Sequence, residues 1–207
     1  MYERQEGLVN STALKDLQVT VVGVGGIGSY AVMSLAKMGV GQITVIDNDR
    51  VEELNIPSQI YRLCDVGKPK VIACLELIKE ATGREIRISP MAYNKQTDKI
   101  IVATVDSMEV RKQIFKTRGK SNLLFIDGRM AAEIGRVLTV KDKETAKLYR
   151  KTLYSDEEAE DMPCSSRAIV YNTAILANII VSQIKKFVAG EELASDILLD
   201  LKNYIFA

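Results

Sequence analysis

The sequence predicts an α/β fold: an open, mostly parallel sheet, doubly wound in the Rossmann-like manner, with an antiparallel C-terminal extension. Three observations support this prediction. Strand-like and helix-like segments alternate along the first 128 residues, a glycine-rich turn follows the first strand, and acidic residues at 47, 106 and 127 directly follow apolar strands. This alternation is typical of parallel sheets covered by helices on both faces.

The first part of the chain shows the clearest pattern. Residues 18–22 alternate as a buried strand, and the apolar residues between 27 and 38 recur at helical spacing until Gly39. Residues 42–46 form the second expected strand. Pro69 suits the start of another helix, and Cys74 falls on the apolar face of that helix.

Later elements follow the same logic. We expect strands at 85–89 and 100–105, a helix at 108–115, and a strand at 122–126 that ends at Asp127-Gly128. A further strand is expected at 135–142, followed by an exposed acidic loop at 154–163. The chain then continues with a long buried helix from about Ser165 and a strand at 196–202.

The length suits a single domain over residues 1–207. We divide it into a nucleotide-binding half at about 1–128, a crossover loop at about 150–166, and a C-terminal helix and strand at about 165–207.

The composition gives no indication of a nucleic-acid partner, a membrane span or a signal peptide. Hydrophobic residues make up 47% of the chain and charged residues 27%, as in ordinary soluble globular proteins. The formal net charge of +1 gives no overall attraction to nucleic acid or to an acidic membrane. The longest apolar run, 168–181, is too short to span a bilayer, and the N-terminal segment is too polar for a signal peptide.

The chain contains no histidine, which excludes Ser-His-Asp hydrolases, Cys-His proteases and histidine-ligated zinc. Its three cysteines, Cys64, Cys74 and Cys164, form no C-x-x-C pair, so we expect neither a disulfide framework nor a structural zinc site. This cysteine usage indicates a protein of the reducing cytoplasm.

The glycine turn is the first candidate binding site. Gly23, Gly25 and Gly28 form G-x-G-x-x-G, and Asp47 follows the next strand. Such a turn brings a phosphate to a helix N-terminus, while the acid binds ribose hydroxyls. The turn alone is compatible with an NAD-dependent oxidoreductase, with another nucleotide-binding protein, or with tight packing only.

The residues after the turn are more specific. The patterns G-x-G-G-x-G, D-x-D-x-V, N-L-x-R-Q and V-G-x-x-K correspond to residues 23–28, 47–51, 55–59 and 66–70. In these motifs the chain resembles the ThiF/MoeB/HesA family of ubiquitin-activating-enzyme-like adenylyltransferases, over essentially its whole length. The resemblance implies an enzyme that binds ATP and Mg²⁺, attaches AMP to the C-terminal glycine of a ubiquitin-fold or sulfur-carrier protein ending in Gly-Gly, and releases pyrophosphate.

The resemblance also implies roles for individual residues. Those expected to bind the nucleotide are Gly23, Gly25, Gly26, Gly28, Asp47, Asp49, Asn55, Gln59 and Lys70.

Catalytic roles extend to other positions. Lys70 is expected to contact the phosphates, with Lys68 as the substitute. Asp106 is expected to hold magnesium, although an aspartate or serine here also suits an N-cap for the following helix. Arg4 matches the arginine that reaches the ATP of the other subunit in family homodimers, so we expect a homodimer with two composite sites.

Two features of this chain leave alternatives open. Ser58 stands where the family has arginine, so a phosphate contact is either missing or supplied by another residue such as Arg62. Cys164 matches the cysteine that forms a thioester in some members. A helix dipole and Arg167 would favour its thiolate, but a buried structural cysteine is an equal alternative.

The substrate is open as well. A tRNA base or a short peptide could replace the carrier protein, although the absence of a basic tract argues against nucleic acid. A non-catalytic scaffold and an NAD-dependent oxidoreductase are the remaining alternatives.

Overall fold

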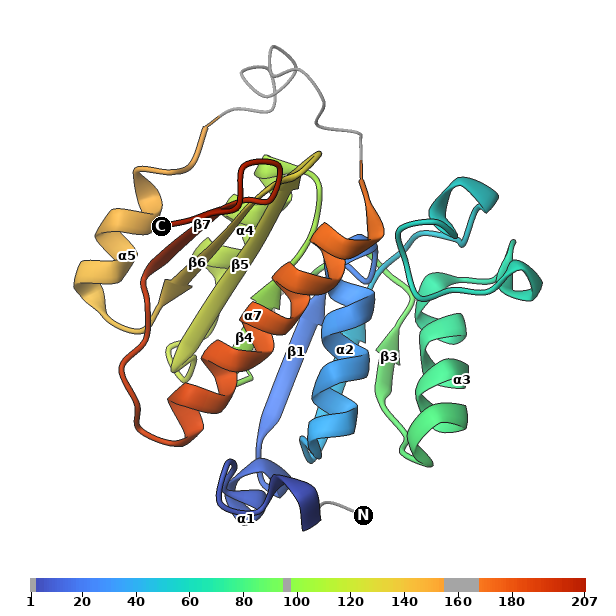
Figure 1. The fold of residues 1–207 in the computed structure, drawn as a ribbon, viewed down its shortest axis with the longest axis horizontal. Coiled ribbons are helices and arrows are strands. Elements are labelled where there is room, and N and C mark those ends of the chain that lie inside the picture. The colour runs from blue at the N-terminus through green and yellow to red at the C-terminus, as the bar shows by residue number, and fades with distance from the viewer. Residues whose placement is uncertain (1–2, 95–97, 155–167) are drawn as a thin grey trace.

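The computed structural model describes residues 3–94, 98–154 and 168–207. Its centre is an eight-stranded sheet with the order β3-β2-β1-β4-β5-β6-β7-β8 (Figure 1). The strands are β1 (Gln18–Val22), β2 (Gln42–Ile46), β3 (Arg87–Ser89), β4 (Ile100–Ala103), β5 (Leu124–Ala131), β6 (Ile134–Val140), β7 (Asp196–Asp200) and β8 (Ile205–Phe206).

Helices cover both faces of the sheet. They are α1 (Ser11–Lys15), α2 (Gly26–Met38), α3 (Lys70–Thr82), α4 (Met108–Thr117), α5 (Lys143–Arg150) and α7 (Val170–Val188), with short 3-10 turns at Glu3–Gln5, Glu53–Asn55 and Leu63–Asp65. One core cluster packs α2, α3 and α7 against one face, and a second packs α4 and α5 against the other (Figure 1). None of the helices in the described ranges is both long and apolar enough to cross a membrane.

The predicted fold class is confirmed. Strands β3, β2, β1, β4 and β5 are parallel, and β6, β7 and β8 add to β5 in antiparallel order. From β1 the chain winds outward to β2 and β3, then crosses to β4 on the other side of β1. The sheet therefore has a topological switch point between β1 and β4, where doubly wound folds bind their ligands.

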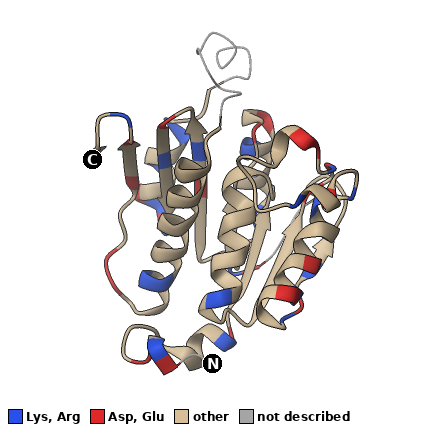
Figure 2. Cartoon of the chain, turned by 45° about the vertical axis from the view of Figure 1, so that its right-hand side comes forward, with Lys and Arg blue, Asp and Glu red and all other residues tan. Residues whose placement is uncertain are grey.

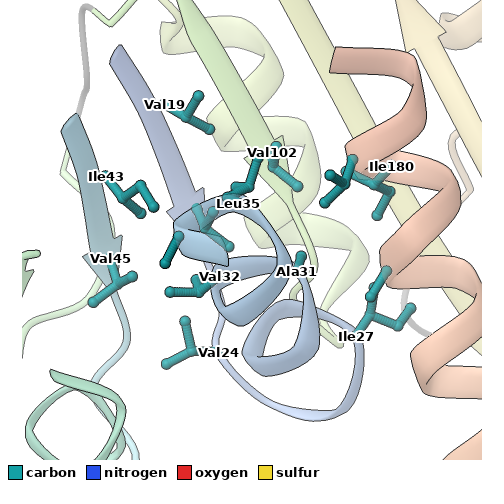
Figure 3. Close-up of a cluster of buried hydrophobic side chains, with 14 of the residues drawn as sticks. Val19, Val24, Ile27, Ala31, Val32, Leu35, Ile43, Val45, Val102 and Ile180 are labelled. Carbon is teal, nitrogen blue, oxygen red and sulfur yellow. The ribbon is translucent and has the colours of Figure 1, made fainter. Parts of the chain in front are cut away.

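Helix α2 lies directly over this switch point. Figure 3 shows Ala31, Val32 and Leu35 of α2 packed among side chains of the strands below, including Val19 and Val102. The helix ends as predicted at Gly39, whose φ of 96° is the left-handed conformation that glycine adopts without strain. This packing fixes the start of α2, and with it the glycine turn.

Several predicted boundaries were wrong. The strand expected to end at Asp127-Gly128 continues to Ala131, because β5 pairs with β6 through a tight turn in which Ala132 has a φ of 53°. The expected strands at 85–89 and 100–105 are shorter, starting at Arg87 and ending at Ala103.

The C-terminal part also differs from expectation. The long helix begins at Val170, because Ala168 forms a β-bridge with Ala132 and Ile169 is extended; residues 165–167 lie outside the described residues. The strand expected at 196–202 ends at Asp200. Helix α5 and strand β8 were not predicted.

Candidate nucleotide-binding site

The glycine turn connects β1 to α2 and is held in one conformation by close backbone contacts. Gly23 has a φ of 85°, and a Cβ atom there would lie 2.8 Å from the carbonyl oxygen of Thr104. A Cβ atom on Gly28 would lie 1.9 Å from the carbonyl oxygen of Gly23. Only glycine fits at these two positions without displacing the backbone, so close packing restricts the conformation of the turn.

The backbone N–H groups at the start of α2 lie at this turn. Gly25 is the N-cap residue, and no side chain of the described residues caps the helix. The first N–H groups of a helix lack partners within the helix and carry its positive dipole end. This arrangement favours an anionic group such as phosphate.

The side chain of Asp47, which directly follows β2, is hydrogen-bonded to the glycine turn. Its carboxylate accepts hydrogen bonds from the backbone N–H of Val24 at 2.7 Å and of Asp49 at 2.8 Å. Burial raises the pKa of Asp47, while the two backbone bonds and the nearby Lys70 act in the opposite direction. Each carboxylate oxygen keeps a second lone pair, so Asp47 can accept further bonds from ribose hydroxyls.

Lys70 lies at the start of α3, beside the end of β2. Its ammonium group is 2.8 Å from the carboxylate of Asp49, and only 9% of its side chain is exposed. The Asp49 side chain, in contrast, is 58% exposed. Lys70 also acts electrostatically on Asp47, so its ammonium group lies close to the carboxylate that is bonded to the glycine turn.

The end of β4 forms the other side of the switch point. The hydroxyl of Thr104 donates to the carbonyl of Gly23 at 2.7 Å, which joins the end of β4 to the glycine turn. Asp106 follows two residues later and is exposed, with its Oδ1 accepting from the N–H of Ser107 at 2.9 Å. Ser107, rather than Asp106, is the N-cap of α4.

Gln59 completes the polar lining. The nearest atom to a Cβ built on Gly25 is the Nε2 of Gln59, at 3.8 Å. The buried Oε1 of Gln59 has no hydrogen-bond partner among the described residues. A buried polar atom without a partner costs free energy, so this atom fits a ligand donor at the turn.

Asn55 has a local role: its side chain accepts from the N–H of Glu52 at 3.0 Å in a capping box. Ser58 is buried, and its carbonyl oxygen lies 3.1 Å from the hydroxyl of Thr173 in α7. A serine hydroxyl lacks the charge and the fork of donors of a guanidinium group, so Ser58 is no substitute for arginine.

Arg62 and Lys68, the two substitutes considered, are engaged elsewhere. Arg62 binds the buried Asp65 and also Glu80, while Lys68 binds Asp65 and Glu76. Burial alone would raise the pKa of Asp65, but the bonds from Arg62 and Lys68 lower it to about 2. These residues form a structural ion-pair cluster rather than a phosphate contact.

The structure separates Arg4 from the other candidates. Arg4 is exposed in the first 3-10 turn, and its neighbour Gln5 contacts the carbonyl of Lys37 near the last turn of α2. Since α2 has 13 residues at about 1.5 Å each, Arg4 lies about 20 Å along this helix from the turn of its own chain. Cys164 and Arg167 lie outside the described residues.

The remaining cysteines differ from each other. Cys74 is buried, and burial raises the pKa of its thiol to about 12, as expected for a structural residue. Cys64 is exposed.

Sequence reasoning missed several residues that shape the site. Thr104 was assigned to a strand interior, although a polar residue at the carboxyl end of a strand is a usable signal. Tyr61 donates to the carbonyl of Val24 at 2.7 Å, and Thr173 packs on the turn from α7. These two contacts join distant parts of the chain, so no local pattern reveals them.

A further buried cluster lies on β5. Asp127 is fully buried and accepts bonds from Arg111, from Arg129 at 2.8 Å and from the hydroxyl of Tyr149 at 2.9 Å. Burial and the nearby carboxylate both raise the pKa of Tyr149, so the phenol stays neutral and acts as a donor. The cluster joins α4, β5 and α5 behind the switch point.

Together these residues fit a nucleotide with its phosphates. The start of α2 presents backbone N–H groups without side-chain caps, Asp47 is bonded to the turn, and Lys70 carries a positive charge close to Asp47. No group of three or more Cys, Asp or Glu side chains in the described ranges forms a metal site by itself. A divalent ion at Asp106 would therefore need oxygen ligands from the nucleotide, which is usual for Mg²⁺.

Known proteins resemble this chain in sequence. The molybdopterin-synthase adenylyltransferase of Salmonella typhimurium is 31% identical over 151 residues, which cover 67% of this chain and 59% of that protein. The tRNA threonylcarbamoyladenosine dehydratase of Bacillus subtilis is 46% identical over 95 residues, covering 45% of this chain and 36% of that protein.

A solved structure shows the same fold. The complex of Escherichia coli MccB with AMPCPP and MccA has a TM-score of 0.76 and 19% identity, covering 95% of this chain and 64% of MccB. In all three comparisons the chain spans less than two thirds of the relative.

The model of the ThiF family matches residues 3–204, nearly the whole chain. This match agrees with the motifs around the glycine turn and with the switch-point geometry, and it confirms the resemblance seen in the sequence. The chain is a member of the ThiF family.

Proposed function

We propose that this chain is an ATP-dependent adenylyltransferase that activates the C-terminal glycine carboxylate of a ubiquitin-fold or sulfur-carrier protein. One observation carries the proposal: the glycine turn, Asp47 with its neighbour Lys70, and the segment leading to Asp106 all meet at the switch point of a ThiF-family sheet. The name of the Salmonella relative supports the reaction class.

Each residue has a definite task in this reaction. The N–H groups at the start of α2 bind the phosphates, and Asp47 and Gln59 orient the nucleoside. The carboxylate oxygen of the carrier forms a bond to the α-phosphorus while the bond to pyrophosphate breaks. Lys70 then stabilises the charge on the departing pyrophosphate.

Asp106 would hold the magnesium ion. When bound, Mg²⁺ neutralises phosphate charge and orients the phosphates. The exposed carboxylate of Asp106, at the carboxyl edge of β4, is free of strong ion pairs with described side chains and can turn toward such an ion.

Carrier-dependent exchange between ATP and labelled pyrophosphate, measured with Mg²⁺, tests the proposal. We expect diglycine-ended carrier proteins to stimulate exchange with the wild type and Asp106→Asn to abolish it. Glu109→Gln, an exposed acid in the first turn of the same helix, is the matched control and should retain exchange. Exchange that persists at the wild-type rate in Asp106→Asn would contradict the role of Asp106.

Two comparisons favour testing other substrates. The tRNA threonylcarbamoyladenosine dehydratase of Bacillus subtilis has the higher identity of the two sequence relatives, and MccB was solved in complex with N-formylated MccA. We therefore repeat the exchange assay with tRNA and with short peptides in place of the carrier. Stimulation by either of these, with none by any carrier, would replace the carrier in the proposal.

If no substrate stimulates pyrophosphate exchange, the remaining candidates are a non-catalytic scaffold and an NAD-dependent oxidoreductase. Equilibrium binding separates these outcomes: a scaffold binds the carrier without nucleotide turnover, whereas an oxidoreductase binds NADH and not ATP. The oxidoreductase alternative gives no role to Lys70, whose side chain is buried and paired with Asp49.

For Cys164 we propose a thioester with the activated carboxyl, formed by attack of the thiolate with release of AMP. Cys164→Ser should keep pyrophosphate exchange while losing a reductant-sensitive adduct with the carrier. An adduct that survives in Cys164→Ser would refute this role.

A further inference from the structure

A cavity lies away from the glycine turn, at the other end of the sheet. It has a volume of about 640 Å³ and is lined by Arg118, Asn122, Leu123, Val140, Lys141, Asp142, Lys143, Ala146, Lys147 and Arg150. These residues come from the end of α4, the segment before β5, the end of β6, and α5. In Figure 1, α5 lies at the edge of the molecule opposite α3.

The cavity and the nucleotide site are at opposite ends of the sheet. Leu123 directly precedes β5, whereas Gly128, further along the same strand, lies near Thr104 and Ile27 at the glycine turn. A ligand in the cavity would therefore not overlap with a nucleotide at the turn.

The lining carries a concentrated positive charge. Five of its residues are basic and one is acidic, a local excess of four charges in a chain whose formal net charge is +1. None of the five basic side chains forms a salt bridge with a carboxylate in the described part of the chain. Elsewhere the two signs are mixed: around α3 in Figure 2, acidic and basic residues lie close together.

The single acid does not neutralise this charge. Asp142 is the N-cap of α5, and its Oδ1 accepts bonds from the N–H and the hydroxyl of Thr145, both at 2.8 Å. Those bonds hold the carboxylate at the end of the helix.

The two arginines are held close to each other by one aromatic ring. The guanidinium carbon of Arg118 lies 3.6 Å from the centre of the Phe115 ring, and that of Arg150 lies 5.5 Å from the same centre. Burial and repulsion by Arg150 both lower the pKa of Arg118. An anion between the two groups would relieve this repulsion.

The size and charge of the cavity indicate the class of ligand. The volume falls in the range of small-molecule sites, and Leu123, Val140 and Ala146 give an apolar wall beside the cations. Five cations around one cavity match a compact anion with several charges better than the single, widely spaced carboxylates of a peptide. We propose that this cavity is a second anion site, for a small molecule of the oligophosphate class.

Titration with inorganic tripolyphosphate, followed by the amide chemical shifts of the full chain, tests the proposal at physiological ionic strength. We expect saturable shifts of residues 141–150 that are separate from shifts of residues 23–28, because the probe can also bind the glycine turn. Lys147→Gln combined with Arg150→Gln should weaken binding at the cavity about tenfold and leave the shifts at the turn unchanged.

Lys151→Gln is the matched control, since Lys151 follows Arg150 but does not line the cavity. Equal weakening by this control would mean diffuse surface attraction and would overturn the proposal, as would the absence of saturation at residues 141–150. An RNA octanucleotide provides the last comparison. If it saturates the cavity and tripolyphosphate does not displace it, the ligand is a nucleic acid and the small-molecule proposal is wrong.

Discussion

Lys70 is bound to Asp49 twice: its backbone N–H donates to the Asp49 carbonyl at 2.9 Å, and its ammonium lies 2.8 Å from the Asp49 carboxylate. The first turn of α3 is thereby fixed to the end of β2. The charge of Lys70 is presented at the carboxyl edge of the sheet before any nucleotide binds. A charge positioned in advance stabilises a transition state without reorganisation.

We expect Lys70→Gln to lower the rate of pyrophosphate exchange about 100-fold, because it removes one preorganised charge from the departing group. Lys68→Gln, two residues earlier, should change the rate less than about threefold, since Lys68 is paired with Asp65 and Glu76 and Asp65 keeps its bonds from Arg62. Parallel exchange assays on the two variants give the comparison. Equal losses would show that the ion-pair cluster around Asp65, rather than Lys70, supports activity.

Gly28→Ala should lower the free energy of unfolding by about 3 kcal/mol, because its Cβ atom would collide with the backbone of Gly23. Gly83→Ala is the control: Gly83 has a φ of 69° but open space around it, so strain alone should cost about 1 kcal/mol. Urea denaturation measures both values. Similar costs would mean that the turn can relax around a methyl group.

Arg4 should act on the site of a second subunit, since it lies at the far end of α2 in its own chain. We expect Arg4→Ala and Lys70→Gln each to retain only a small fraction of the exchange rate separately and to recover about a quarter of the wild-type rate when mixed. Half of randomly mixed dimers are heterodimers, and each of these has one intact site. No recovery after verified subunit exchange would exclude a composite site.

Asp127→Ala should destabilise the fold by about 3–5 kcal/mol, because it leaves Arg111 and Arg129 buried without their carboxylate. Asp196→Ala removes an exposed partner of Arg136 and should cost about 1 kcal/mol or less. Thermal and urea unfolding of both variants distinguish the two environments. A small loss for Asp127→Ala would mean that water enters and solvates the arginines.

Asp65 should make stability depend on acidity. Its pKa in the folded protein is about 2, below the ordinary value of about 4, so its contribution is present above about pH 4 and is lost as the pH falls toward 2. The free energy of unfolding of Asp65→Asn should therefore fall less steeply over this range. Urea denaturation at several pH values measures the two slopes, and parallel slopes would contradict the prediction.

The glycine turn and the strands on either side of it were predictable because local chemistry defines them. Gly39 ends α2 by its left-handed conformation, and apolar alternation marks β1. The β5–β6 turn was not predictable, since Ala132 adopts a positive φ without the glycine that normally signals one.

Other features of the fold were not predicted from the sequence. Helix α5 is strongly amphipathic, with Ala146 and Tyr149 buried, but it is only eight residues long and polar overall, and it was missed for that reason. The bonds of Thr104 to Gly23 and of Thr173 to Ser58 span 81 and 115 residues of sequence. The motifs therefore identified segments that meet at the switch point, whereas the residues that hold these segments together became visible only in the folded chain.

The first turn of α7 rests directly on the glycine turn: a Cβ atom on Gly26 would lie 2.9 Å from the Thr173 methyl group, while the Thr173 hydroxyl lies 3.1 Å from the Ser58 carbonyl. Positions 26, 58 and 173, which are distant in the sequence, thus lie close together in the fold. A larger residue at position 26 or 173 requires a compensating change at the other or a displaced α7. Over evolution, substitutions at these positions are expected to occur together, which makes the pair a marker for how closely a relative keeps this arrangement.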